Sequence, residues 1–163
     1  MVCEKFLTPT CLSTCKSKNS CIASIDNRKS VVCAEKHKKY QLENQRRVVI
    51  CNYHIDGGVI KDSSEKKCDY LILVPDTKYV VLVELKGCKI ITAVEQIENT
   101  LALFKEKLYH HKIFARIICQ QVPQMHNIPE INALKKLLKL AGGNLDIKAK
   151  LLCEKETELT NQK

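Results

Sequence analysis

The sequence has no tryptophan and only three phenylalanines among its 163 residues. Proteins that read single-stranded nucleic acid by base stacking depend on aromatic side chains, so this mode of recognition is disfavoured. No apolar run approaches the roughly 18 residues that a membrane-spanning helix needs, and the first residues, MVCEKFLTPT, lack the apolar segment of a signal peptide. We therefore expect a cytoplasmic protein. Walker loops, the G-x-S-x-G elbow and the dinucleotide-binding fingerprint are also absent from the sequence.

The composition indicates one folded domain with a basic surface. Apolar residues make up 45% of the chain, enough for a real core in a protein of this length. Lysine and arginine number 27 against 18 aspartates and glutamates, which gives a formal net charge of +9. Such an excess favours a polyanionic partner, with nucleic acid the first candidate. The alternative is a basic surface that serves solubility alone.

Because the sequence shows no export signal, its ten cysteines are expected to be reduced thiols and not a disulfide framework. Cys11, Cys15, Cys21 and Cys33 are separated by three, five and eleven residues, whereas zinc sites usually contain C-x2-C pairs. With His37 as a conceivable substitute ligand, a structural Zn²⁺ is disfavoured but stays an alternative. A zinc-stabilised interaction module is therefore one interpretation of the chain.

The hydrophobic pattern predicts an α/β fold with a central mixed β-sheet flanked by helices. Residues 1–29 show no sustained period and form an irregular, cysteine-containing arm, residues 30–153 form the domain, and residues 154–163 form a mobile polar tail. Within the domain we predict, in chain order, a helix over 31–45, strands over 46–56, 69–74 and 79–86, a helix from Thr92 to about 108, a strand over 112–122, a helix over 129–141 and a strand over 144–152.

The stretch CDYLILVPDTKYVVLVELKG, residues 68–87, reads as a buried hairpin that carries charged residues at its open end. Whether Asp76 and Thr77 form the tip or the four residues from Pro75 to Lys78 do, the register pairs Asp69 with Glu84 on one face, with Cβ atoms ~4.5–5.5 Å apart. Lys86 projects from the same face, since side chains alternate along a strand. Three ionic groups are therefore predicted to converge.

Two facing carboxylates repel each other unless a cation lies between them. Mg²⁺ accepts hard oxygen ligands and is typically held by one or two carboxylates together with water and phosphate oxygens. The alternative is a simple ion pair between Lys86 and one of the acids at the end of a sheet.

Asp69, fourteen intervening residues and then Glu84-Leu85-Lys86 in a hydrophobic hairpin resemble the PD-(D/E)xK nuclease superfamily, the restriction-endonuclease-like and Holliday-junction-resolvase-like enzymes. The resemblance implies a core with the order α-β-β-β-α-β, followed here by α-β. It implies that Asp69, Glu84 and the backbone carbonyl of Leu85 bind Mg²⁺, or Mn²⁺ in its place. Lys86 would position or activate the attacking water.

Two accessory catalytic residues follow from the same resemblance. Gln96, near the start of the helix after the hairpin, would contact the site or the scissile phosphate, and Glu35 would contribute a carboxylate from the first helix, with Glu43 as the reserve. The literal Pro75-Asp76 dipeptide is a decoy, because Asp76 at the tip lies on the order of 23 Å from Asp69 along the strands.

The sequence therefore predicts a Mg²⁺-dependent nuclease that hydrolyses phosphodiester bonds of DNA. The alternative is a catalytically inactive member of the same fold that binds nucleic acid or a protein partner, and a homodimer is compatible with either. Phosphate contacts would come from basic residues on both sides of the first strand and before the hairpin. These residues are Lys38, Lys39, Arg46, Arg47, Lys61, Lys66 and Lys67.

Overall fold

The structure, a computed structural model, describes residues 6–7, 21–87, 89–124 and 127–161. It has an α/β architecture with a mixed central sheet and helices, as the hydrophobic pattern predicts. The elements in chain order are β1 (Ile22–Asp26), β2 (Ser30–Glu35), β3 (Lys38–Glu43), β4 (Ile50–His54), β5 (Tyr70–Val74), β6 (Tyr79–Leu85), α2 (Ile90–Leu103), α3 (Lys105–Leu108), β7 (Lys112–Cys119), α4 (Pro129–Leu140), β8 (Leu145–Ala149), β9 (Leu151–Lys155) and α5 (Glu156–Thr160).

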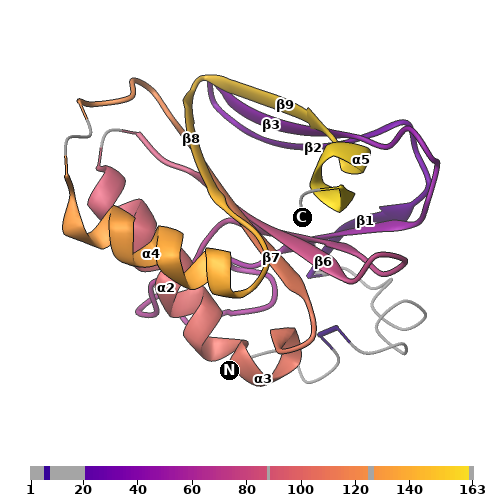
Figure 1. The fold of residues 1–163 in the computed structure, drawn as a ribbon, viewed down its shortest axis with the longest axis horizontal. Coiled ribbons are helices and arrows are strands. Elements are labelled where there is room, and N and C mark those ends of the chain that lie inside the picture. Colours follow the sequence, from indigo (N-terminus) through magenta and orange to yellow (C-terminus); the bar gives the residue numbers. More distant parts are fainter. Residues whose placement is uncertain (1–5, 8–20, 88, 125–126, 162–163) are drawn as a thin grey trace.

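The strands form two sheets that lie one above the other. The larger, six-stranded sheet has the order β1-β4-β5-β6-β7-β8, and the smaller has the order β2-β3-β9. Strands β1, β4, β5 and β6 pair antiparallel, whereas β6, β7 and β8 run parallel. Helices α2 and α4 cover one face of the larger sheet and the smaller sheet covers the other (Figure 1).

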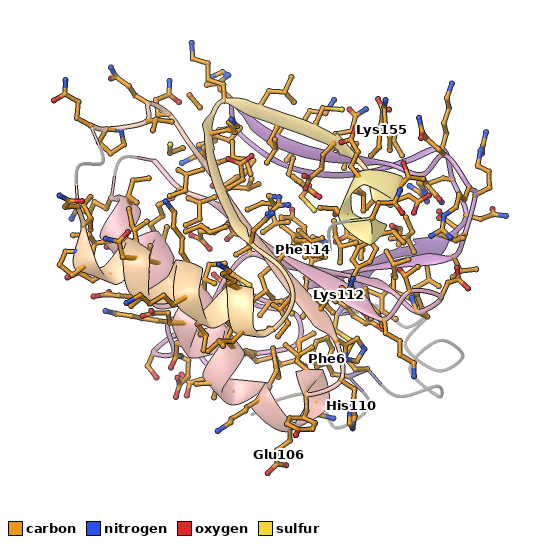
Figure 2. The ribbon with its side chains drawn as sticks, viewed as in Figure 1. Phe6, Glu106, His110, Lys112, Phe114 and Lys155 are labelled. Carbon is orange, nitrogen blue, oxygen red and sulfur yellow. The ribbon has the colours of Figure 1, made fainter. Side chains whose placement is uncertain are left out.

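Both faces of the larger sheet are buried because alternate residues of its central strands serve two separate cores. On β6, Val80 and Leu82 belong to the core beneath the helices, and Val81 and Val83 belong to the core between the sheets. Phe114 on β7 lies between the sheets, on the side away from the helices (Figure 2). The continuous apolar run of β6 is typical of a strand covered on both sides.

The helix predicted over residues 31–45 is wrong, because this segment forms the antiparallel hairpin of β2 and β3. Val31 and Cys33 on β2, and Tyr40 and Leu42 on β3, are buried at intervals of two residues against the larger sheet. Lys36 has a positive φ of 53°, which allows the chain to reverse. Burial at a period of two thus outweighs the helix propensity of the lysines and glutamates.

The elements after the hairpin agree better with the prediction. Helix α2 buries Val94, Ile97 and Leu101 as expected, but it begins at Ile90, so Thr92 lies inside it and does not cap it. Helix α4 has Pro129 in its first turn. The predicted strands over 46–56 and 112–122 correspond to β4 and β7.

Secondary structure extends beyond both predicted limits of the domain. Strand β1 lies inside the arm predicted over residues 1–29 and pairs with β4. The strand predicted over 144–152 is two strands, β8 and β9, which join different sheets. Where we expected a polar tail, α5 buries Leu159 and Glu156, and Glu156 accepts hydrogen bonds from the Arg46 guanidinium.

The cysteine cluster is only partly within the described residues. Cys11 and Cys15 lie outside them, whereas Cys21 and Cys33 are buried, and the Cys33 thiol lies 3.7 Å from the Asn52 side-chain oxygen. In the described part of the chain, no helix is long and apolar enough to cross a membrane.

Candidate active site

The register of the β5–β6 hairpin is the one predicted from its sequence. Tyr70 pairs with Val83 and Val74 pairs with Tyr79, so the next step of the same ladder sets Asp69 opposite Glu84. Since Val80 and Leu82 face the helices, alternation turns Glu84 toward α2 as well. The pair therefore lies at the end of the sheet where β6, β7 and β8 all terminate.

Asp69 is held in place by the backbone of the opposite strand. The Leu85 N–H donates a hydrogen bond of 2.7 Å to Asp69 Oδ2. Burial raises the pKa of Asp69 to about 6; the Leu85 N–H and Lys86 oppose this shift, and the carboxylates of Glu35 and Asp56 add to it. The Asp69 carboxyl is thus poised to titrate near neutral pH.

Glu84 is a buried acid with an unused oxygen. It is only 1% exposed, and its Oε1 lies 3.8 Å from Lys86 Nζ. Its Oε2 is buried and has no hydrogen-bond partner among the described residues. Burial raises the pKa of Glu84 to about 9, with the negative charge of Asp69 as the next cause and Lys86 acting against both. An unsatisfied buried carboxylate oxygen is costly, and a bound cation would remove that cost.

Gln96 connects Lys86 to the loop that precedes Asp69. Lys86 Nζ donates to Gln96 Oε1 at 2.7 Å, and Gln96 Nε2 donates to the Lys67 carbonyl at 2.7 Å. One turn further along α2, Thr100 Oγ1 accepts a hydrogen bond of 2.9 Å from the Cys68 N–H. Side chains of α2 therefore hold both the ammonium group of Lys86 and the backbone of the residues just before Asp69.

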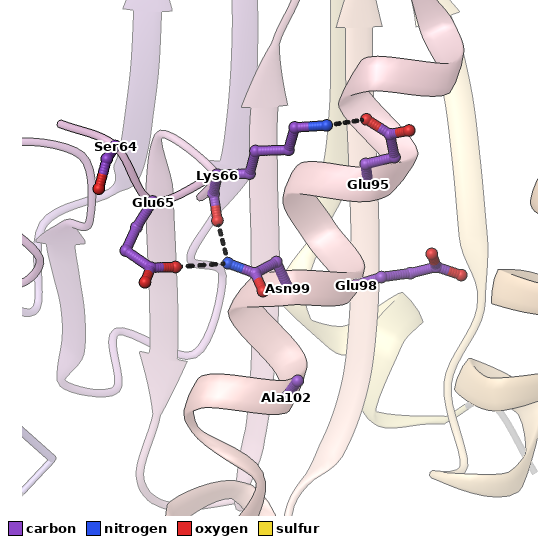
Figure 3. A pocket seen from close by; sticks show the side chains of 7 residues that line it. All are labelled: Ser64, Glu65, Lys66, Glu95, Glu98, Asn99 and Ala102. Carbon is purple, nitrogen blue, oxygen red and sulfur yellow. Dashed lines mark hydrogen bonds and ion pairs between the residues drawn. The ribbon is translucent and has the colours of Figure 1, made fainter. Parts of the chain in front are cut away.

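A polar hollow of ≈ 530 Å³ lies beside these contacts, between α2 and the loop before β5 (Figure 3). There Asn99 Nδ2 donates to the Lys66 carbonyl, and Lys66 Nζ lies 2.6 Å from Glu95. A larger, mainly apolar hollow of ≈ 730 Å³ lies between α2, α3 and α4. Neither of these two hollows is lined by Asp69 or Glu84.

Asp56 also approaches the candidate site, although the sequence did not single it out. Its carboxylate raises the pKa of both Asp69 and Glu84, and it lies 3.2 Å from the ammonium group of Lys67. From the sequence, Asp56 is only the last residue of the strand predicted over 46–56. Asp56 follows the end of β4, and β4 lies next to β5 in the sheet. An acid at the end of the strand before the hairpin was the sequence signal that could have indicated its position near Asp69.

The predicted first-helix acids lie on the β2–β3 hairpin instead. Glu35 ends β2, close enough to Asp69 to raise its pKa. Glu43 ends β3 at the other end of the hairpin, where its Oε1 atom accepts a hydrogen bond of 3.6 Å from the Cys153 thiol. The structure thus brings Glu35 toward the site and leaves Glu43 away from it.

Several of the predicted phosphate contacts are engaged within the protein. Lys67 is 4% exposed and donates to the backbone carbonyls of Asp62 and Glu65. Lys38 is 7% exposed. Neither side chain is accessible to a polymer at the surface.

The remaining predicted basic residues differ in their surroundings. Arg46 lies 2.9 Å from the buried Glu156 and 3.4 Å from Asp76 at the hairpin tip, which is the end of β5 and β6 opposite to Asp69. Lys66 is paired with Glu95, as described above. Arg47 and Lys61 are exposed, and Lys39 is partly exposed.

Asp69 and Glu84 offer oxygen donors, the type of ligand that a hard divalent cation accepts. Among the described residues, no set of three or more histidine, cysteine, aspartate or glutamate side chains is arranged as a metal site. Two carboxylates with one vacant oxygen match Mg²⁺, which keeps several waters and needs only one or two protein carboxylates.

No protein-family model, curated protein or solved structure matches this chain. The likeness to the PD-(D/E)xK superfamily consequently stays a prediction that rests on Asp69, Glu84 and Lys86 and on the hairpin that presents them.

Proposed function

We propose that this chain is a Mg²⁺-dependent nuclease that hydrolyses phosphodiester bonds of DNA, with a restriction-endonuclease-like core formed by β4, β5, β6, α2 and β7. The observation that carries the proposal is the facing pair of Asp69 and Glu84. The Oε2 atom of Glu84 is buried and has no hydrogen-bond partner among the described residues, and Lys86 Nζ lies 3.8 Å from its Oε1 atom. The basic composition is consistent with a polyanionic substrate.

The two carboxylates and the backbone carbonyl of Leu85 would hold the cation. When bound, Mg²⁺ or Mn²⁺ supplies Lewis-acid activation of water and offsets negative charge on the phosphate. The Leu85 N–H fixes Asp69 in place, so the ligand oxygens are oriented before the substrate arrives.

Lys86 would act on the phosphate itself. Hydrolysis joins a water oxygen to phosphorus and breaks one ester P–O bond. The attacking water gives up a proton to solvent, the leaving oxygen takes one up, and negative charge grows on the leaving and non-bridging oxygens of the phosphate. An ammonium group at this position stabilises that charge. Gln96 accepts a hydrogen bond from Lys86 and so limits where the ammonium group can lie, which makes Gln96 a positioning residue.

Cleavage of supercoiled and linear DNA with Mg²⁺ or Mn²⁺ tests the proposal. Lys86→Ala and Asp69→Asn should each reduce the cleavage rate by about 10²–10³-fold, the usual effect of removing one electrostatic contact to a transition state. Asp76→Asn is the matched control, because Asp76 lies at the far tip of the same hairpin, and it should leave the rate unchanged.

Two results would contradict the proposal. Loss of activity in Asp76→Asn with activity kept in Asp69→Asn would place the metal site elsewhere. A wild-type protein that binds DNA at low salt and does not cut it with either cation would favour the inactive, nucleic-acid-binding alternative.

A further inference from the structure

Two lysine-containing turns from distant parts of the sequence meet beside the candidate site. The first joins β2 to β3 and contains Lys36, and the second joins β8 to β9 and contains Lys150. The Lys39 N–H donates a hydrogen bond of 2.8 Å to the Lys150 carbonyl, which holds the two turns together (Figure 1). Both Lys36 and Lys150 have positive φ, 53° and 62°.

Backbone hydrogen bonds connect these turns to the end of β6. The Lys150 N–H donates to the Cys119 carbonyl at 2.9 Å, and the next residue, Gln120, donates to the Gly87 carbonyl at 2.9 Å. Gly87 directly follows Lys86. The two turns and the candidate site therefore lie on one continuous edge of the fold, where β6, β7 and β8 end.

The side chains on this edge are basic and accessible. We call Lys36, Lys39, Lys148 and Lys150 the basic rim. The Lys36 side chain is 76% exposed and that of Lys148 is 53% exposed. Their nearest acids, Glu35 at 4.0 Å and Asp146 at 3.7 Å, form solvent-exposed pairs, which hold a lysine only weakly. A phosphate group can therefore displace these acids.

The start of α2 adds a positive end to the same edge. Helix α2 is 14 residues long, has no side-chain cap at Lys89 and has no acidic residue in its first turn. Such a helix end presents free N–H groups and a partial positive charge. Since α2 begins shortly after Lys86, its first turn lies at the same end of the sheet as the candidate site.

We propose that the basic rim binds the phosphate backbone of the DNA next to the bond that is cut, and so guides the substrate across the ends of β6, β7 and β8. This inference rests on the proposed nuclease function and specifies how its substrate is held. It also replaces part of the predicted phosphate surface, because Lys38 and Lys67 are buried and the Arg46 guanidinium is paired with Glu156. Of the seven predicted contacts, only Lys39 belongs to the rim.

DNA binding in EDTA, where no cleavage can occur, tests the basic rim by itself. The variant Lys36→Gln with Lys150→Gln removes two rim charges, and Lys135→Gln with Lys136→Gln removes two exposed charges from α4, on the helix side of the fold. Both double variants change the net charge equally. Fluorescence anisotropy with a labelled DNA duplex, over a series of salt concentrations, gives the affinity and its salt dependence.

We expect the rim variant to lower the slope of log affinity against log salt by about two, because each phosphate contact releases about one counterion. At about 0.1 M salt this corresponds to a loss of affinity on the order of 100-fold. The α4 variant should keep the wild-type slope. An unchanged slope in the rim variant, or an equal change in both variants, would overturn the inference.

Measuring both DNA binding and DNA cleavage with the same proteins distinguishes a failure of this inference from a failure of the nuclease proposal. If the rim variant binds weakly but cuts DNA at saturating concentration, the rim inference stands together with the nuclease. If the wild type cuts DNA while the rim variant binds as tightly as the wild type, only the rim inference fails. If the rim governs binding and no protein cuts, only the nuclease proposal fails.

Discussion

Glu84→Gln should change how the stability of the protein depends on pH. The substitution keeps the shape of the side chain and removes its ionisable proton. The pKa of Glu84 is about 9 in the folded protein, against an ordinary value of 4.5 that holds for the unfolded chain. Between these values the folded protein keeps a proton that the unfolded chain has released, so unfolding becomes easier as the pH rises.

The size of this effect follows from linkage. One such carboxyl lowers the free energy of unfolding by about 1.4 kcal/mol for each pH unit in that window. Asp69, with a pKa of about 6 instead of 3.8, contributes in the same direction only below about pH 6. Between pH 6 and pH 9 the Glu84→Gln curve should therefore be flatter than the wild-type curve by about 1.4 kcal/mol per pH unit.

Urea denaturation followed by circular dichroism, in EDTA and across this pH range, measures the slopes. Glu106→Gln is the matched control, because Glu106 projects into solvent from α3 (Figure 2), and its curve should run parallel to the wild type. Parallel curves for wild type and Glu84→Gln would refute the conclusion that a buried, protonated Glu84 is part of the folded state.

Adding millimolar Mg²⁺ in place of EDTA to the same denaturation experiment tests whether a cation binds Asp69 and Glu84. A cation that binds the ionised pair competes with the proton on Glu84, so it should stabilise the wild type more as the pH rises. At 100 times its dissociation constant the gain would be about 2.7 kcal/mol. The Glu84→Gln variant should gain little, and an equal gain in both proteins would mean that the cation binds elsewhere.

Three further substitutions test the fold by urea denaturation. Arg116→Met should lower the free energy of unfolding by about 3–5 kcal/mol, because Glu154 lies 2.7 Å from the buried guanidinium and would lose its only charged partner, keeping just the hydrogen bond from the Tyr40 hydroxyl among the described residues; an unchanged midpoint would contradict this. Leu159→Ala should cost about 2–5 kcal/mol if α5 is packed as part of the core, whereas a mobile tail would show no change. Gly143→Ala should destabilise by roughly 1–3 kcal/mol, since the added Cβ would lie 1.9 Å from the Ile113 carbonyl oxygen, and wild-type stability would rule out this close approach.

The hairpin of β5 and β6 could be predicted from sequence because its information is local. Two apolar runs flank one set of turn residues, and a turn fixes the register of the strands that it joins. This placed Asp69 opposite Glu84 and Lys86 on the same face before any tertiary contact was known. The apolar stripe of α2 was likewise visible as a period of three to four residues.

The sequence of residues 31–45 was ambiguous, and tertiary packing decided its structure. Good helix formers and an alternating apolar pattern occur together there, and the larger sheet offers a buried face for Val31 and Tyr40 only when they lie on strands. A segment with two competing local signals takes the conformation that buries more apolar surface.

By itself the sequence therefore determined the acids, the lysine and the hairpin that presents them, since these depend on neighbours along the chain. Only the tertiary structure decided that Asp56 and Glu35 approach the pair, that Lys67 and Arg46 are engaged internally, and that Lys36 and Lys150 meet at one edge. These residues come from distant segments, and their proximity follows from how the two sheets stack, which no local pattern records.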